Sequence, residues 1–322
     1  MISVVTVAMN RTEHLLQQAR AVSGLHGHAE HVILDFGSTT PIRRDQLPGD
    51  ERIQLHRVES PNGRWWLTHS YNLAFALASG DYILKLDADI LPSQHFIDLL
   101  SEQQVATNAH LMCNRLTLQD WSLPSKLFTT NGLFLCKKTS LAQVRGFNPY
   151  IQGWGWDEID LYSRFFLAGF SASRIPQDGL DLIQHDNDVR EHPVISTDLR
   201  RIGLSKAALD RLSATRRMQA QNEKNKLVAL ASIKRQVKWP SLDDYAKAYR
   251  NLSRLPDLLS VSLFNAQERQ SLVAGLRYQL LKPSRKENLC WRVVKKLGFG
   301  PYTSANTQAL LHVCNIELEL IA

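Results

Sequence analysis

The hydrophobic positions along the first hundred residues follow two alternating spacings. Apolar, often β-branched residues fill short runs at residues 3–9, 31–34, 53–58 and 82–86. Between these runs, apolar residues recur every three or four positions, as in the segments that follow Thr12 and Leu67. Short apolar runs predict buried strands, and the wider spacing predicts amphipathic helices. Strands that alternate with helices favour a mostly parallel α/β sheet covered by helices.

The rest of the chain changes character near residue 200. Before it, the pattern predicts strands at residues 131–136 and 180–184 and a helix at 157–166. After it, the composition is typical of helices, which we expect at residues 205–237, 258–281, 287–297 and 306–320. Ser241 followed by Asp244 resembles a helix capping box in which Asp replaces the usual Glu.

The charge distribution supports the same division. Residues 1–199 hold 16 Lys and Arg against 22 Asp and Glu, whereas residues 200–322 hold 22 against 9. We therefore predict an α/β catalytic domain over residues 1–199 and a basic α-helical domain over residues 200–322.

The sequence also indicates the cellular compartment in which we expect the protein. The sequence shows no signal-peptide pattern and no apolar stretch of about 20 residues. The four cysteines have no CxxC spacing, which favours free thiols in a reducing compartment. We expect a cytoplasmic protein, with any membrane contact peripheral and at the inner face.

Two carboxylates follow the apolar run at residues 82–86. Asp87 and Asp89 are separated by one residue, so on a continuing strand they project to the same side. Neighbouring carboxylates both stay ionised when a cation lies between them. The pattern predicts a metal site at the carboxyl end of a strand. The alternative is an acidic turn that caps the next helix.

Further motifs occur in a recognisable order along residues 1–190. They are Asn10-Arg11, Asp35, Asp87-x-Asp89, Gly153-Trp154-Gly155 followed by two acids, and His185. This order resembles the family 2 glycosyltransferases, and within them the β-1,4-galactosyltransferase and chondroitin-polymerase type. Residues 10–15 read Asn-Arg-Thr-Glu-His-Leu, which is similar to a segment of the vertebrate β-1,4-galactosyltransferases.

The resemblance implies a GT-A fold, a nucleotide-sugar donor that is most often a UDP-sugar, a divalent cation and inversion at the anomeric carbon. It assigns Asp89 and His185 to the metal, with Asp87 on the ribose or sharing the metal. Carboxylate, imidazole and phosphate ligands suit Mn²⁺ or Mg²⁺. A cation also neutralises the charge that develops on a diphosphate leaving group.

The resemblance places the catalytic base in the acidic pair Asp157-Glu158. Their order is the reverse of the family's Glu-Asp, and Trp156 replaces a common Gly. By position Glu158 corresponds to the base and Asp157 to the acid that holds acceptor hydroxyls. Both are also suited to a helix N-terminus, where acids are stabilised by the dipole. Asp160 either joins this group or only caps the helix.

The remaining assignments concern the donor and acceptor. Through the resemblance, these residues contact the nucleotide-sugar or the acceptor: Asn10, Arg11, Asp35, Asn72, Asp87 and Trp154. Arg64 and Lys85 offer positive charge near the diphosphate, although isolated basic residues are more often solvated. Trp154 offers a flat apolar face for a sugar, and core packing is an equal alternative.

Other functional classes fit less well. A nucleotide-sugar-binding module without turnover predicts the loss of one acidic or metal-binding residue, and all are present. A nucleotidyltransferase is disfavoured because the N-terminus has no Gly-rich phosphate loop. Nucleic-acid binding rests on charge alone. We expect a glycan or lipid-linked acceptor, and contact between the basic C-terminal helices and an anionic membrane or an acidic glycan.

Overall fold

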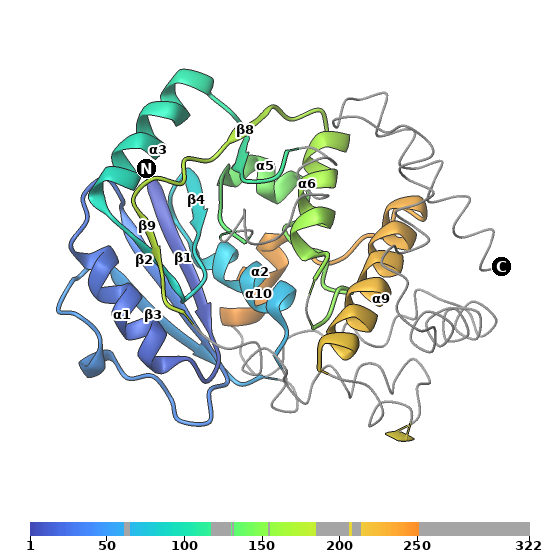
Figure 1. Ribbon diagram of the computed structural model, residues 1–322, viewed down its shortest axis with the longest axis horizontal. Helices are drawn as coiled ribbons and strands as arrows, with labels where there is room; N and C mark the ends of the chain where they lie inside the picture. Colours follow the sequence, from blue (N-terminus) through green and yellow to red (C-terminus); the bar gives the residue numbers. More distant parts are fainter. Residues whose placement is uncertain are drawn as a thin grey trace.

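Figure 1 shows the computed structural model, which describes residues 1–60, 65–116, 130, 132–153, 155–184, 206–207 and 214–250. Seven strands form one sheet in the order β3-β2-β1-β4-β7-β6-β8, and β5 and β9 form a second, two-stranded sheet. The strands are β1 Ile2–Ala8, β2 Glu30–Phe36, β3 Ile53–Val58, β4 Tyr82–Lys85, β5 Ile90–Pro92, β6 Leu111–Cys113, β7 Phe134–Lys137, β8 Ala172–Arg174 and β9 Leu180–Leu182. The helices are α1 Thr12–Ser23, the short 3₁₀ turn η1 Arg44–Gln46, α2 Leu67–Leu77, α3 Gln94–Thr107, α5 Lys138–Gln143, α6 Asp157–Leu167, α9 Ala214–Lys234 and α10 Leu242–Arg250.

The predicted α/β architecture is confirmed, and most of the sheet is parallel. Strand β1 lies at its centre and pairs in parallel with both β2 and β4, while β3 extends the sheet beyond β2. Strand β7 is the antiparallel exception, because it runs opposite to both of its neighbours, β4 and β6. Strand β8 continues the sheet in parallel with β6.

Helices cover both faces of the sheet, which explains why its central strands are apolar on both sides. Val5 and Val7 of β1 belong to the core cluster formed with α2, α6 and α10. Val4, between them, points to the opposite cluster, which includes residues of α1 and α3. Figure 1 shows α1 and α3 on one side of the sheet and α2, α6 and α10 on the other.

Several expectations about single elements are corrected. Helix α3 is absent from our predictions, although Ser93 caps it and Phe96, Ile97 and Leu100 bury one face. The strand predicted at residues 180–184 is β9, which pairs with β5 and lies outside the main sheet. Strands β6 and β8 have three residues each, too few to produce a readable period.

The C-terminal region contributes to the same core. The capping box is confirmed, since Asp244 N donates to Ser241 Oγ at 3.2 Å and Ser241 N donates to Asp244 Oδ2 at 2.8 Å. Helix α10, which follows it, buries Leu242 and Tyr245 in the cluster that contains α2. The boundary expected near residue 200 is not tested, because residues 185–205 lie outside the described part. Helices α9 and α10 nevertheless pack on the N-terminal region.

Candidate active site

The topology places a ligand site between β1 and β4. The connection from β1 to β2 runs through α1 on one face, and the connection from β3 to β4 runs through α2 on the other. The order of strands therefore reverses between β1 and β4. Ligands of open α/β sheets bind at the carboxyl ends of the strands beside such a reversal. Asn10 follows β1 and Asp87 follows β4, so both lie at this edge.

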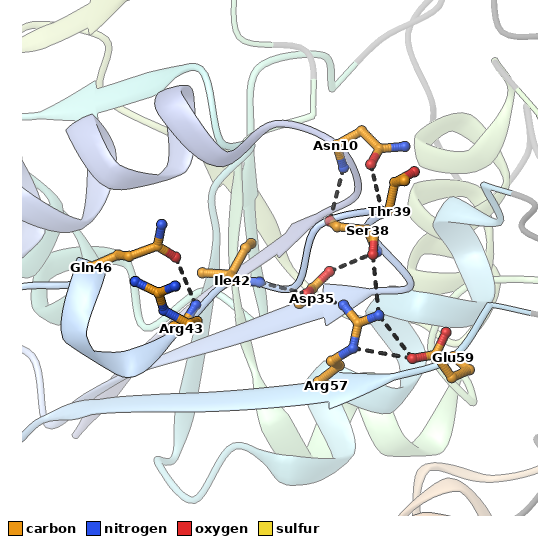
Figure 2. Close-up of polar contacts among 9 residues, drawn as sticks. All are labelled: Asn10, Asp35, Ser38, Thr39, Ile42, Arg43, Gln46, Arg57 and Glu59. Atoms are coloured by element: carbon orange, nitrogen blue, oxygen red, sulfur yellow. Dashed lines mark hydrogen bonds and ion pairs between the residues drawn. The ribbon is translucent and has the colours of Figure 1, made fainter.

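The loops after β1 and β2 are locked together by hydrogen bonds (Figure 2). Asn10 N donates to Ser38 Oγ at 2.9 Å, and Thr39 N donates to Asn10 Oδ1 at 2.8 Å. Asn10 has a φ of 56°, a left-handed conformation that Asn tolerates better than most residues. Arg11 follows directly and occupies the N-cap position of α1. We refer to Asn10, Asp35, Ser38, Thr39 and Arg57 as the loop cluster.

The buried carboxylate of Asp35 fixes the conformation of the loop cluster. Its carboxylate accepts hydrogen bonds from Ser38 N at 2.9 Å and Ile42 N at 3.0 Å, and Arg57 forms an ion pair with it. Arg57 also donates to Ser38 O at 3.1 Å (Figure 2). Asp35 has no exposed surface. Asp35 thus shapes the loop in this structure, and its expected contact with the nucleotide-sugar stays a prediction.

The second part of the site begins with Asp87 and Asp89. Strand β4 ends at Lys85, and the Asp87-Ala88-Asp89 segment forms a turn in which Ile90 N donates to Asp87 O at 3.0 Å. The expectation that strand alternation aligns the two carboxylates is therefore wrong. Gln18 of α1 fixes this turn, because its Nε2 donates to Asp87 O at 2.5 Å and to Ile90 O at 3.2 Å. Both acids remain partly exposed.

Lys85 departs most from expectation, because it is completely buried. It lies on the same face of β4 as Ile83, toward α2, and its Nζ is 2.8 Å from Asp87 Oδ1. Tyr71 of α2 donates its hydroxyl to the same oxygen at 3.0 Å, and the Lys85 ammonium lies 4.7 Å from the Tyr71 ring centroid. Burial lowers the pKa of Lys85, but the carboxylates of Asp87, Glu158 and Asp157 outweigh it and raise that pKa above its usual value. The ammonium is therefore charged.

The acidic pair meets these residues around Gly132. Asp157 and Glu158 open α6, and both belong to its first turn. A Cβ added at Gly132 would collide with Asp87 Oδ2 and Lys85 Nζ and would lie 3.2 Å from Glu158 Oε1. The polar ends of these three side chains thus surround the Gly132 Cα. We call Lys85, Asp87, Asp157 and Glu158 the acidic cluster.

The two acids of the pair have different environments. Asp157 is 5% exposed, whereas Glu158 is partly exposed. Burial raises the pKa of the Asp157 carboxyl well above its usual range, and the neighbouring Glu158 raises it further through its charge and a hydrogen bond. Asp157 therefore keeps its proton to a higher pH than an ordinary aspartate. Two carboxyls with separated environments are suited to different roles.

Two sequence candidates have other roles in the structure. Asp160 is buried and forms an ion pair with Arg164 at 2.7 Å, one helical turn later, so it belongs to the packing of α6. Asn72 is also buried: its Nδ2 donates to Phe147 O at 2.8 Å and its Oδ1 accepts from Phe147 N at 2.7 Å. Both ends of its amide are therefore used inside the fold, and the expected orientation toward the donor is not observed.

Helix α9 supports the loop that precedes the acidic pair. Gln221 donates to Gln152 O, and Asn225 Nδ2 donates to Gly155 O at 2.9 Å. Gly155 has a φ of 92°, and a Cβ there would collide with the Asn222 side chain. The same holds at Gly153, where a Cβ would lie 2.9 Å from Gln221 Cδ. The two glycines therefore provide both the backbone conformation and the room for α9.

Three predicted site residues, Arg64, Trp154 and His185, lie outside the described residues. The sequence analysis missed four other residues, which contact the predicted site residues or make room for them: Gln18, Arg57, Tyr71 and Gly132. Arg57 could have been found, because the strands predicted at residues 31–34 and 53–58 bring it and Asp35 toward the same edge of a parallel sheet; the register of β2 and β3 pairs the two directly. The contacts of the other three depend on tertiary packing.

The described residues also bear on metal and membrane binding. Among them, no three His, Cys, Asp or Glu side chains are grouped closely enough to hold a metal ion. Asp87 and Asp89 nevertheless provide oxygen donors at one turn, and Asp87 is 36% exposed. This donor set fits a hard cation that takes its remaining ligands from phosphates and water. No helix of the described part is long and apolar enough to cross a membrane.

Comparison with protein families supports the sequence resemblance over part of the chain. Residues 110–189 match the model of a family described as the N-terminal domain of galactosyltransferase. This segment contains β6 to β9 and the acidic pair. It is therefore similar to galactosyltransferases. No curated protein matches the sequence.

Several solved structures have a partly similar arrangement. TarS from S. aureus in complex with UDP-GlcNAc is 12% identical, with 78% of this chain and 91% of that chain covered and a TM-score of 0.48. Glucosyl-3-phosphoglycerate synthase from Mycobacterium tuberculosis, with Mn²⁺, UDP and glucosyl-3-phosphoglycerate, is 19% identical, with 64% and 81% covered and a TM-score of 0.42. A Drosophila β-1,4-galactosyltransferase 7 mutant with manganese, UDP-Gal and xylobiose is 19% identical, with 59% and 74% covered and a TM-score of 0.40.

Proposed function

We propose that this protein is a GT-A-type, metal-dependent glycosyltransferase that moves a sugar from a nucleotide-sugar, with UDP as the expected nucleotide, to a hydroxyl acceptor with inversion. The observation that carries the proposal is the acidic cluster, in which Asp87 from the end of β4 meets Glu158 from the start of α6 around Gly132. The family match over residues 110–189 supports the sugar-transfer chemistry. The order of motifs supports assignment to family 2.

The loop cluster is the proposed binding site for the nucleotide. Its conformation is fixed before any ligand arrives, because Asp35, Ser38 and Asn10 already hold one another. A prearranged loop loses little conformational entropy on binding. Arg11, at the start of α1, places a positive charge beside the positive end of the helix dipole, which favours a diphosphate.

Glu158 is the proposed base, and its greater exposure supports this choice over Asp157. A base must reach the acceptor hydroxyl, and Glu158 is the more exposed of the two. Asp157, protonated to higher pH, donates a hydrogen bond to Glu158 and orients it, instead of holding the acceptor as we first expected. The acceptor oxygen bonds to the anomeric carbon and its proton passes to Glu158. The bond from that carbon to the diphosphate breaks, and its electron pair leaves with the nucleotide.

Asp87 and Asp89 are the proposed protein ligands of the cation, with Mn²⁺ or Mg²⁺ expected. When bound, the cation supplies Lewis-acid stabilisation of the negative charge on the departing diphosphate. His185, which lies outside the described residues, stays a predicted third ligand. Arg64 and Trp154 likewise stay predicted contacts of the donor and acceptor.

The acceptor and the cellular location remain proposals that rest on sequence. Residues 251–322, which hold the predicted basic amphipathic helix, lie outside the described part. We retain a glycan or lipid-linked acceptor, and peripheral contact with an anionic membrane from the cytoplasmic side, as the partners that best match the basic charge.

The proposal is tested by incubating the protein with a panel of UDP- and GDP-sugars, with Mn²⁺, Mg²⁺ or excess EDTA, and measuring nucleotide release. We expect release from one class of donor with a divalent cation and none with EDTA. Nucleotide binding without release from any donor and acceptor pair would support the rival binding module. NMR of the product then reports the anomeric configuration, and a retained configuration would contradict the inverting mechanism.

A further inference from the structure

Lys85 occupies a position that the proposed reaction does not itself explain. A lysine side chain without exposed surface is rare in the middle of a sheet, where most neighbours are apolar. Its carbon stem lies on the α2 face of β4, and its Nζ contacts Asp87 Oδ1 and the Tyr71 ring. Such a residue retains its charge only when carboxylates surround it. The acidic cluster provides them.

The same ammonium faces the carboxylate that we propose as a metal ligand. Asp87 accepts at Oδ1 from both Lys85 and Tyr71, so one of its two oxygens is already engaged within the protein. A divalent cation at Asp87 would lie a few ångströms from a fixed positive charge. At that separation a divalent cation and an ammonium repel each other even in a partly screened site. The free protein therefore opposes the metal that its carboxylates attract.

We propose that Lys85 is an internal counter-cation that keeps the affinity of the free protein for divalent metal low, so that metal binds tightly only together with the nucleotide diphosphate. The inference rests on the proposed function. The diphosphate adds negative charge and oxygen ligands beside Asp87 and thereby outweighs the ammonium. Lys85 thus acts as a positioning residue whose charge sets the order in which the site fills.

A purely structural role for Lys85 predicts the opposite sign. If the ammonium only orients Asp87 for the metal, its removal weakens metal binding. If it acts as a counter-cation, removal tightens metal binding in the absence of nucleotide. The direction of the change therefore separates the two roles without any measurement of turnover.

The test is titration of the full-length protein with Mn²⁺, without nucleotide, while free Mn²⁺ is followed by EPR. We expect Lys85→Met to bind Mn²⁺ roughly ten-fold or more tightly than wild type, because a nearby positive charge is lost. Lys85→Arg keeps the charge and is expected to stay within about two-fold of wild type. Lys247→Met makes the same change at an exposed position of α10 and is expected to have no effect. Unchanged or weaker binding by Lys85→Met would overturn the proposal.

A second measurement avoids the possibility that Lys85→Met does not fold. Wild-type protein is titrated with Mn²⁺ in the presence and absence of saturating UDP, with the Mn²⁺–UDP equilibrium measured separately. We expect UDP to raise the Mn²⁺ affinity at least about five-fold, within the range of ordinary coupling between sites. Equal affinities would contradict the inference. Absence of turnover with every nucleotide-sugar would instead contradict the proposed function. The metal titration of the free protein would still test the role of Lys85, because it does not depend on turnover.

Discussion

The two parts of the site edge treat their carboxylates in opposite ways. In the loop cluster, Asp35 is matched by two backbone N–H groups and by Arg57, so its charge is satisfied within the fold. In the acidic cluster, three carboxyl groups, those of Asp87, Asp157 and Glu158, lie around the ammonium of Lys85. The first arrangement fixes geometry, and the second leaves an imbalance of charge that chemistry can use. The cluster that we propose for nucleotide binding and the cluster that we propose for catalysis thus lie side by side along one edge of one sheet.

The largest effect is expected in the acidic cluster. Glu158→Gln removes the proposed base but keeps the shape of the side chain, so turnover should fall about 10²–10⁴-fold. UDP binding, measured by calorimetry, should be nearly unchanged because the loop cluster is intact. Glu102→Gln, at an exposed position of α3, is the matched control. If Glu158→Gln turns over like wild type and Asp157→Asn does not, the two acids have exchanged the roles that we assign.

Removing the Arg57 ion pair from the loop cluster should change protein stability and KM for the donor more than kcat. Arg57→Met leaves the buried Asp35 carboxylate with only its two backbone donors, and we expect a loss of about 2 kcal/mol in the free energy of unfolding. The loop that Asp35 shapes should loosen, so KM for the donor should rise more than kcat falls. Urea unfolding and steady-state kinetics measure both effects. A fall in kcat at constant KM would show that the two clusters are not separate.

The free energy of unfolding should fall at acid pH, because strand β2, which leads to the loop cluster, contains a buried histidine. Burial lowers the pKa of His31 from 6.5 to about 3, and Thr6 Oγ1 lies 3.1 Å from its Nε2. A histidine with a lowered folded-state pKa contributes stability above pH ~6.5 that is lost progressively as the pH falls toward the folded value. At pH 5 this amounts to about 2 kcal/mol.

Urea unfolding at pH 7 and pH 5 measures this loss. His31→Gln should reduce the difference between the two pH values, whereas His26→Gln, at an exposed position, should leave it as in wild type. An unchanged pH dependence in His31→Gln would contradict the assignment of the acid sensitivity to this residue.

The smallest expected difference, between two glycine variants compared by urea unfolding, concerns the loop before the acidic pair. Gly155 and Gly169 have φ values of 92° and 76°, but a Cβ at Gly155 collides with Asn222 whereas one at Gly169 has nothing within 4 Å. Substitution by Ala at either site should cost about 1 kcal/mol from the backbone alone. Gly155→Ala should cost about 1 kcal/mol more, because it displaces α9. Equal losses in the two variants would show that α9 does not press on this loop.

The sequence predicted the scaffold better than the site. Apolar runs located β1 to β4 and the helices between them, because these elements are long enough to show a period. The acidic residues of the site were also found, since carboxylates after a strand or at a helix start stand out. What failed was geometry: Asp87 and Asp89 lie on a turn, and Lys85 points inward. Whether a charged side chain on a strand is solvated depends on partners distant in the chain, which no local pattern encodes.

One contact joins two helices that lie far apart in the sequence, α2 and α10. His69 Nδ1 of α2 lies 2.8 Å from the hydroxyl of Tyr245 in α10, and the two residues are separated by 176 positions. Because a ribosome adds roughly 5–20 residues each second, α2 emerges about ten to thirty seconds before its cover is made. During that time His69 and the stacked Trp66 have no α10 above them. Until α10 has been synthesised, the surface of α2 at His69 therefore lacks the aromatic cover that Tyr245 gives it in the folded protein.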